Sequence, residues 1–354
     1  MRTFDYSFLK GLTVNMDLLN TVSMIETLKE RDSNRILRFP ATYRDMESAA
    51  MVQSVFGSNA IEGIFTSDDR LKDICMRKVE PKGHDESEIA GYRDALDLIH
   101  REYESLDIDL AIIRQLHRIT LSYTKDGGGE WKNVDNIIGR RNPDGSISVT
   151  FRPMSADETP EAMEQLVLAY RLAIQDSGIN RLLLIPCFIQ DFLSIHPFLD
   201  GNGRTSRLLS LLLLYKEGYD VGKYVSFENM TYRNRPEYYR SLSMSSKGWI
   251  DGMNDYMPFI RNFLGILLLC YKELDRRFAT AVGVKTNKTS RIEYAVMNSL
   301  LPISKRELCE NLPDISEVMV ANVLRRLLRE GMIEKVGSGP ATRYRRAGDR
   351  PDHP

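Results

Sequence analysis

Residues 196–207 read HPFLDGNGRTSR, so one imidazole, one carboxylate and two guanidinium groups lie within a single short segment. Gly201 and Gly203 let backbone N–H groups approach phosphate oxygens without a bulky side chain, and they should leave Asn202 exposed between them. The leucine-rich run that follows predicts a buried helix, whose N-terminal amides and dipole favour anions. The segment therefore predicts a phosphate-binding loop.

The side chains of the same segment suit a reaction at phosphate. His196 is the residue type best able to accept a proton near neutral pH. Asp200 suits Mg²⁺, which prefers one or two carboxylates together with substrate phosphates. Arg204 and Arg207 lie one helical turn apart, and each guanidinium can bind phosphate oxygens bidentately. Each residue alone could be a helix cap, a turn or a solvated charge, but their combination between two apolar helices predicts a catalytic site.

These residues resemble the HPFx(D/E)GNGRxxR signature of the Fic-domain family at every defined position. The resemblance implies an all-helical core with a small hairpin, and transfer of AMP from ATP to a hydroxyl side chain of a protein. It makes His196 the base that deprotonates the target hydroxyl and Asp200 the Mg²⁺ ligand. The phosphate-binding residues that it implies are Gly201, Asn202, Gly203, Arg204 and Arg207. The related branch that phosphorylates its targets typically carries lysine where this chain has Gly203, so AMP transfer is favoured.

A second resemblance lies upstream, where residues 58–63 read SNAIEG and match the family's inhibitory pattern (S/T)xxxE(G/N). Ser58 and Glu62 would lie one turn apart on a helix that Gly63 ends. The resemblance implies that Glu62 reaches Arg207 and blocks the γ-phosphate of ATP. Because the pattern precedes the signature in the chain, it indicates the N-terminally inhibited class. A helix end with a solvated glutamate is the alternative.

Two further segments resemble family elements. Residues 136–153 contain two β-prone runs around Asn-Pro-Asp-Gly at 142–145, which predicts a hairpin. It lies where the family has a flap, and an exposed hairpin edge suits strand addition by a target protein. A hairpin without a binding role is the alternative. Residues 235–242 resemble the segment that closes over the adenine, with Tyr239 as the stacking partner, although this aromatic pair could equally belong to the core.

Composition sets wider limits. The chain has 354 residues, of which 27% are charged and 42% hydrophobic, which suggests about two domains. A net charge of −1 gives no whole-chain case for a nucleic-acid or membrane partner. The N-terminus lacks an apolar signal core and the leucine runs are too short to span a bilayer, so we expect a cytoplasmic protein. The four cysteines have no metal-ligand spacing and should be reduced and structural.

The periodicity of apolar residues predicts a mainly α fold. We expect an N-terminal helical region at residues 1–80 with the inhibitory helix at about 45–64, and a catalytic core at 81–282. Helices are predicted at residues 8–31, 43–64, 86–103, 109–123, 160–175, 180–195, 205–217, 235–243 and 255–279.

Residues 283–354 resemble a winged-helix domain. Helices are predicted there at residues 291–300, 304–310 and 316–330, followed by β-prone runs at 332–336 and 342–346. Basic residues gather in the last run, at Arg343, Arg345 and Arg346, so the domain could bind DNA through its third helix. Contact with a protein, including a second copy in a homodimer, is equally compatible with its acidic residues.

Two classes of function therefore remain. The first is an ATP-dependent AMP transferase held off by Glu62, with removal of AMP from a modified protein as a variant in which Glu62 orients a water. The second is a DNA-binding regulator whose core only senses nucleotide. The intact pair of His196 and Asp200 favours the first, since a sensor needs no base.

Overall fold

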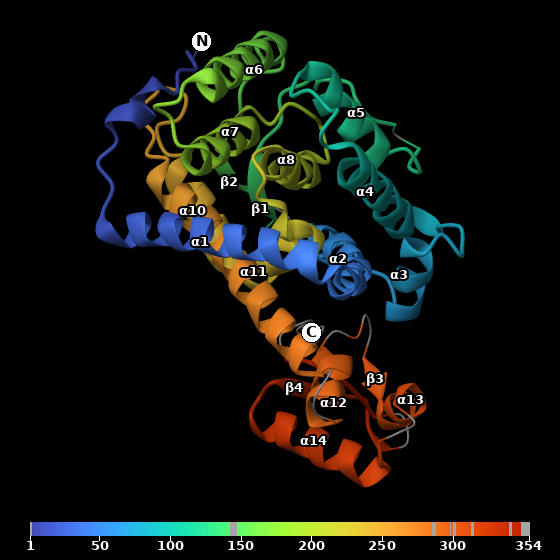
Figure 1. The fold of residues 1–354 in the computed structure, drawn as a ribbon. Helices are drawn as coiled ribbons and strands as arrows, with labels where there is room; N and C mark the ends of the chain where they lie inside the picture. The colour runs from blue at the N-terminus through green and yellow to red at the C-terminus, as the bar shows by residue number, and fades with distance from the viewer. Residues whose placement is uncertain are drawn as a thin grey trace.

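The computed structural model describes residues 2–125, 127–141, 147–284, 288–297, 299, 302–312, 315–339 and 342–347. These residues form a large helical body and a smaller C-terminal unit, and the long helix α11 (Met257–Val284) reaches from one to the other (Figure 1). Their buried apolar side chains form two clusters, one extending from Phe4 to Phe278 and the other from Ile292 to Ile333. The predicted mainly α fold is confirmed. Among the described residues, no helix combines the length and the apolar character that a membrane crossing requires.

The N-terminal elements pack into the same apolar cluster as the rest of the helical body. They are η1 (Ser7–Gly11), α1 (Met16–Arg38), α2 (Pro40–Ile61) and α3 (Asp68–Cys75). The first predicted helix starts later than expected because Asn15 caps α1, where its side chain accepts from the N–H of Leu18 at 3.1 Å. Pro40 begins α2 at a position that needs no N–H donor, so only Phe39 separates the two helices.

The rest of the helical body lies between residues 83 and 284 and includes the buried helix α8. Its helices are α4 (Gly83–Glu102), α5 (Leu110–Thr120), α6 (Thr159–Gln175), α7 (Arg181–Ile195), α8 (Asn202–Lys216), η2 (Asp220–Lys223), α9 (Phe227–Arg233), α10 (Arg235–Ser245) and α11. All seven helices predicted between residues 86 and 279 are present. The short elements α3, α9 and η2 were not predicted, because one or two turns carry too little periodicity to recognise.

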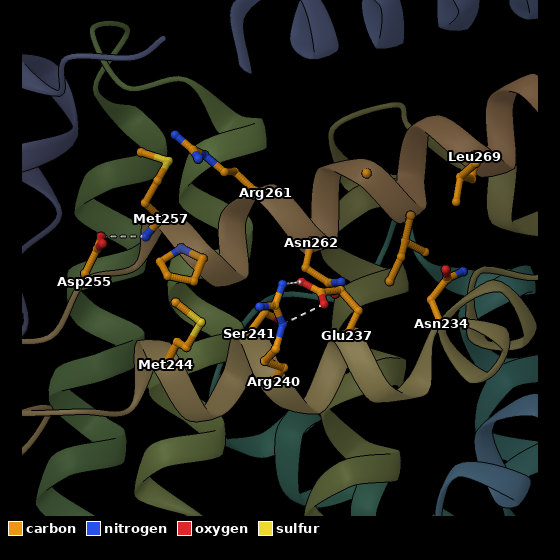
Figure 2. Close-up of a pocket in the computed structure, with 13 residues that line it drawn as sticks. Asn234, Glu237, Arg240, Ser241, Met244, Asp255, Met257, Arg261, Asn262 and Leu269 are labelled. Carbon is orange, nitrogen blue, oxygen red and sulfur yellow. Dashed lines mark hydrogen bonds and ion pairs between the residues drawn. The ribbon is translucent and has the colours of Figure 1, made fainter. Parts of the chain in front are cut away.

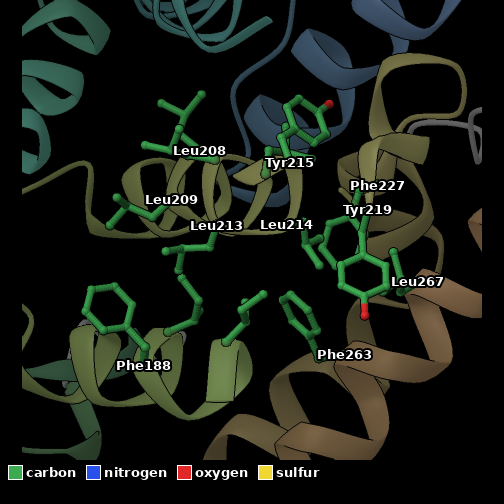
Figure 3. Packing of buried hydrophobic residues seen from close by; sticks show 14 of the residues in the cluster. Phe188, Leu208, Leu209, Leu213, Leu214, Tyr215, Tyr219, Phe227, Phe263 and Leu267 are labelled. Carbon is green, nitrogen blue, oxygen red and sulfur yellow. The ribbon is translucent and has the colours of Figure 1, made fainter. Parts of the chain in front are cut away.

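Helix α8 is buried along nearly its whole length. Leu208, Leu209 and the four leucines at residues 211–214 are at most 1% exposed. Figure 3 shows this packing, in which Phe188 of α7 and Phe263 of α11 approach the leucines from different sides. Burying each such side chain contributes about 1.5–3 kcal/mol relative to leaving it exposed. The loop is therefore continuous with a helix that is firmly held in the core of the body.

The predicted hairpin is formed by β1 (Ile138–Arg141) and β2 (Ile147–Phe151). The strands are antiparallel, with Gly139 opposite Val149 and an irregularity of register between Ile138 and Gly139. The turn expected at residues 142–145 lies outside the described residues. Both ends of the hairpin lead back to the helical body near the end of α7, as hydrogen bonds described below show.

The C-terminal unit contains three helices and a small sheet. Its elements are α12 (Lys288–Met297), β3 (Ile303–Ser304), α13 (Lys305–Asn311), α14 (Glu317–Arg329), β4 (Ile333–Val336) and β5 (Arg343–Arg346). The three predicted helices and two predicted strands occur in the predicted order, and the unpredicted strand β3 completes a sheet of order β3-β5-β4. A capping box in which Ser304 and Glu307 satisfy one another's backbone N–H groups starts α13.

One buried carboxylate joins the two parts of the chain. Glu273 on α11 is 6% exposed and accepts hydrogen bonds from Arg276, Arg277 and, from β5, Arg346. Burial alone would raise the pKa of Glu273, but the three guanidinium groups lower it, so the carboxylate stays ionised. Arg277 also donates to Gln53 of α2 at 3.3 Å. The C-terminal unit is thus tied to α11, and α11 to α2.

Candidate phosphate-binding and catalytic site

His196 lies where α7 ends, and its backbone adopts the left-handed conformation with φ 53° and ψ 61°. Its N–H donates to the carbonyl of Phe192 at 2.9 Å, and its ring Nδ1 lies 3.3 Å from the carbonyl of Leu193. Since a carbonyl can only accept, Nδ1 carries the proton of the neutral ring and Nε2 carries the free lone pair. Burial lowers the pKa of His196 to about 4. At neutral pH the imidazole is therefore uncharged and able to accept a proton.

Asn202 begins α8 after Gly201, which has the positive φ of 76° that favours glycine. The expectation that Asn202 is exposed was wrong, because only 2% of the residue is accessible. Its amide closes the loop: Nδ2 donates to the carbonyl of Phe198 at 2.7 Å and Oδ1 accepts from the N–H of Phe198 at 2.9 Å. The first N–H groups of α8, which lack partners within any helix, are thus the loop's donors for an anion.

Arg204 is almost completely buried, with 2% of it exposed. Its NH2 atom binds Glu88 of α4 at 2.8 Å and lies 3.3 Å from Asp200. Its Nε and NH1 atoms are buried without a hydrogen-bond partner among the described residues. A buried donor without a partner costs about 1–3 kcal/mol, and more if it is charged. This guanidinium therefore has two donor nitrogens that no described group of the protein satisfies.

Asp200 exposes 75% of its side chain beside the loop. Its backbone carbonyl is held by His117, whereas its carboxylate contacts only the edge of Arg204 among the described groups. Within the described ranges, no cluster of three or more acidic, histidine or cysteine side chains could hold a metal ion by itself. A Mg²⁺ at Asp200 would therefore take its other ligands from phosphates and water, which is the coordination that Mg²⁺ prefers.

The guanidinium of Arg207 faces α2 and is hydrogen-bonded to two residues of its C-terminal end. Its Nε donates to the hydroxyl of Ser58 at 2.8 Å, and its NH2 donates to the carbonyl of Ser58 at 2.9 Å and to Glu62 at 2.7 Å. Burial alone would lower the pKa of Arg207, but Glu62 and neighbouring tyrosines raise it. The guanidinium therefore stays charged and forms an ion pair with Glu62. Glu62 caps α2 and Gly63 follows with φ 82°, as predicted for the helix end. The predicted proximity of Glu62 and Arg207 is thus present in the structure.

Glu62 also fills the space beside the loop. A Cβ atom built on Gly203 would collide with its carboxylate oxygen. The glycine and the glutamate therefore fit one another in this conformation, and a phosphate beside Gly203 would compete with Glu62 for the same space.

The two tyrosines of α10 occupy different environments. Tyr238 is 7% exposed and belongs to the apolar cluster, whereas Tyr239 is 47% exposed. The hydroxyl of Tyr239 donates to the carbonyl of Ile61 at 3.4 Å, which places the ring beside the end of α2. Only Tyr239 is thus accessible to a ligand, and its stacking on adenine stays a prediction.

Sequence reasoning missed two residues that hold the loop. His117 of α5 stacks on Phe198 with a centroid distance of 3.7 Å, accepts the N–H of Gly129 at Nδ1, and donates from Nε2 to the carbonyl of Asp200. Glu88 of α4 holds Arg204. Each is a polar residue on the buried face of its helix, a pattern that does not show what the residue will contact.

A separate groove lies between α10 and α11, with a volume of about 740 Å³ (Figure 2). Met244, Met257 and Leu269 contribute apolar lining, and the ion pair of Glu237 with Arg240 lies at its side. No residue predicted for phosphate or metal binding lines it. The groups with phosphate chemistry lie at the α8 loop, where Glu62 occupies part of the space.

Comparison with known proteins finds similarity to Fic proteins. Residues 107–214, which include the loop and most of α8, match the family model described as Fic/DOC family. Protein adenylyltransferase Fic of Culex quinquefasciatus is 29% identical over 282 residues, covering 73% of this chain and 52% of that protein. Protein adenylyltransferase Fic of Drosophila grimshawi is 27% identical over 256 residues, covering 68% and 48%. The chain thus spans about half the length of the curated relatives that it matches.

Solved structures show the same fold. A Fic family protein from Desulfovibrio desulfuricans G20 aligns with a TM-score of 0.60 at 20% identity, covering 97% of this chain and 99% of that one. Fic-1 (residues 134–508) from C. elegans aligns with a TM-score of 0.57 at 20% identity over 74% of each chain.

Proposed function

Because residues 107–214 match the Fic/DOC family model, we propose that the chain is a Fic-family protein that transfers AMP from ATP to a hydroxyl side chain of a target protein. The observation that carries the proposal is the buried guanidinium of Arg204, two nitrogens of which have no partner among the described residues. The same segment, residues 196–207, carries His196, a neutral imidazole whose Nε2 can accept a proton. A cationic phosphate site next to a base is the combination that nucleotidyl transfer requires.

In the proposed transfer, one bond to the α-phosphorus forms as another breaks. The target hydroxyl oxygen attacks the α-phosphorus of ATP, the bond from that phosphorus to the oxygen that bridges to the β-phosphate breaks, and pyrophosphate leaves. His196 takes the hydroxyl proton at Nε2. Arg204 and the first N–H groups of α8 stabilise the negative charge, which in such transfers contributes more than covalent chemistry does. Bound at Asp200, Mg²⁺ would neutralise charge on the phosphates.

We further propose that Glu62 inhibits this reaction by occupying Arg207. The ion pair uses the guanidinium that would otherwise receive the terminal phosphate, and Glu62 lies against Gly203. Ser58 orients the same guanidinium through its hydroxyl and its carbonyl. Under this proposal the chain would belong to the class inhibited by an N-terminal helix of its own.

The target would dock on the exposed edge of the hairpin β1–β2. Val149 is 42% exposed and Ile137, just before β1, is 44% exposed, so apolar side chains are accessible there. A short antiparallel pair with a free edge can accept an extended peptide as a further strand.

The test uses ATP labelled either at the α- or at the γ-phosphate, with Glu62→Gly protein and Glu62→Gly/His196→Ala protein. AMP transfer predicts that label enters protein only from the α position, with release of pyrophosphate, and only in the single variant. Incorporation from the γ position would replace the proposal with phosphorylation. Removal of AMP from a modified protein is the alternative activity. To distinguish it from AMP transfer, the α-labelled product is incubated with wild-type protein in the absence of ATP, and the release of AMP is measured.

The DNA-binding alternative depends on free basic side chains in the C-terminal unit. The three arginines of β5 are instead engaged by glutamates, in the pairs Arg343–Glu307, Arg345–Glu334 and Arg346–Glu273. Exposed arginines remain at Arg325 and Arg329 of α14. We therefore rank this alternative second, and a gel shift with the full chain tests it.

A further inference from the structure

The backbone at His196 needs support from outside its own helix. Residues other than glycine rarely adopt its left-handed conformation, and such strain persists only where the surroundings hold it. The hydrogen bonds from His196 back into α7 fix its N–H and its ring but do not hold the four peptide carbonyls of residues 195–198; within the loop, Asn202 binds the carbonyl of Phe198. The position of Nε2 thus depends on what binds those carbonyls.

Two residues from the segment before the hairpin bind all four of them. Lys132 Nζ donates to the carbonyl of Ile195 at 3.0 Å, and the backbone N–H of Lys132 donates to the carbonyl of Pro197 at 2.8 Å. The amide nitrogen of Asn136 donates to the carbonyls of His196 at 3.4 Å and of Phe198 at 3.0 Å. Every peptide carbonyl from 195 to 198 is therefore bound by residue 132 or residue 136.

The same lysine also binds the far end of the hairpin. Lys132 Nζ donates to the carbonyl of Met154, which follows β2, at 2.5 Å, and to the side chain of Asn136, which precedes β1, at 3.0 Å. An ammonium group has three protons, and here each has an acceptor: Asn136, Met154 and Ile195. Lys132 is 3% exposed, and burial lowers its pKa to about 8, so water does not replace these contacts and the group is still mostly charged at pH 7.

We propose that Lys132 and Asn136 are positioning residues that hold the hairpin and the His196 turn as one unit, so that a peptide docked on the hairpin meets the base in a fixed geometry. This rests on the proposed AMP transfer and on the hairpin as the docking edge. No hydrogen bond described here joins either residue to the ring of His196, to Arg204 or to Arg207. Their effect should therefore appear in turnover and in the use of target, and not in binding of ATP at Arg204 and Arg207.

The test compares Lys132→Met, Lys132→Arg and Asn136→Ala in the Glu62→Gly background, with Lys125→Met as the matched control at an exposed lysine of the preceding loop. Lys132→Met should lower kcat about 100-fold, as a misplaced catalytic group does, while the Kd of ATP stays within about twofold. Lys132→Arg should restore part of kcat because it keeps a cationic donor. Asn136→Ala keeps the lysine contacts to Met154 and Ile195 and should give a smaller loss, which provides a second variant if Lys132→Met does not fold.

A second readout does not depend on activity. In protein with isotope-labelled histidine, Lys132→Met and Asn136→Ala should shift the ring signals of His196, identified with His196→Ala, more than those of the other four histidines in the sequence. Equal loss of ATP affinity and kcat, or unchanged kcat in folded Lys132→Met, overturns the positioning role, and so do unchanged His196 signals. If Glu62→Gly protein labels nothing, AMP transfer fails, and the histidine signals still decide the positioning role.

Discussion

Replacing Glu62 by glycine isolates the inhibitory contact more cleanly than most substitutions could. Glu62 caps α2 with φ −86° and ψ 0° and precedes Gly63, so a glycine there removes the side chain without weakening a helix interior. The two contacts from Ser58 to Arg207 remain and keep the guanidinium in place. The substitution therefore removes one carboxylate and little else.

The magnitude follows from the geometry. A hydrogen bond between charged groups contributes about 1.5–3 kcal/mol, and the Glu62–Arg207 contact is 2.7 Å long. Because the Glu62 side chain is 32% exposed, water screens part of this energy, and we take ~2 kcal/mol. ATP must displace this contact to place its terminal phosphate at Arg207. Removing the carboxylate should then raise the transfer rate about 30-fold, since each 1.36 kcal/mol is a factor of ten.

The assay is self-labelling with ATP labelled at the α-phosphate, under conditions in which wild-type protein is not saturated. Glu62→Gln, which keeps the shape and a neutral hydrogen bond worth about 0.5–1.5 kcal/mol, should give an intermediate rise. Glu104→Gly, at an exposed carboxylate in the turn after α4, is the control for loss of a surface charge. A rate for Glu62→Gly equal to that of wild type would refute the inhibitory role, and an equal rise for the glutamine variant would mean that charge is not its basis.

Three further outcomes follow from the structure. The neutral imidazole is the active form of His196 and burial lowers its pKa to about 4, so the rate of Glu62→Gly protein should stay level as pH falls through 6.5 and drop only near 4; an acid limb near 6.5 in the pH–rate profile would contradict this. Asp200→Asn should raise the Mg²⁺ concentration for half-maximal transfer at least about tenfold, measured by metal titration, and a wild-type rate independent of divalent metal would exclude the assigned role. Glu273→Ala leaves three arginines without their shared carboxylate and should lower the free energy of unfolding by about 3 kcal/mol in urea, whereas a loss below about 1 kcal/mol would mean that water already satisfies them.

The parts of the site that could be predicted from the sequence are those determined by neighbours along the chain. The loop at Gly201, the buried leucines after it and the helix end at Gly63 each follow from local residue types. Asn202 was misjudged for a related reason: its position was recognised but its partner, the backbone of Phe198 four residues earlier, was not. A polar side chain between two glycines can face a ligand or close its own loop, and the residue type fits both.

The supporting residues could not be predicted, because their partners are far away in sequence. His117 meets Asp200 across 83 positions, and Lys132 meets Ile195 across 63. Each is recognisable only as a polar residue until the packing of α5 against α8, and of the hairpin segment against the end of α7, is known. The match of Glu62 to Arg207 across 145 positions was expected only because a family resemblance supplied it.

The two proposed controls act at opposite ends of residues 196–207 and should be independent. Glu62 acts on Arg207 from α2, whereas Lys132 acts on the turn around His196 from the hairpin. No hydrogen bond described here joins the two sets, and what they share is their opposite effect on the pKa of His196, which Glu62 raises and Lys132 lowers. Changes at sites without shared partners usually add within about 0.5 kcal/mol, which is about a twofold rate difference. A cycle of wild type, Glu62→Gly, Lys132→Met and the double variant should therefore show the same fold-loss from Lys132→Met with and without Glu62. If the loss differs by more than about fivefold between the two backgrounds, the loop transmits one control to the other, and the separation of phosphate placement from base placement is wrong.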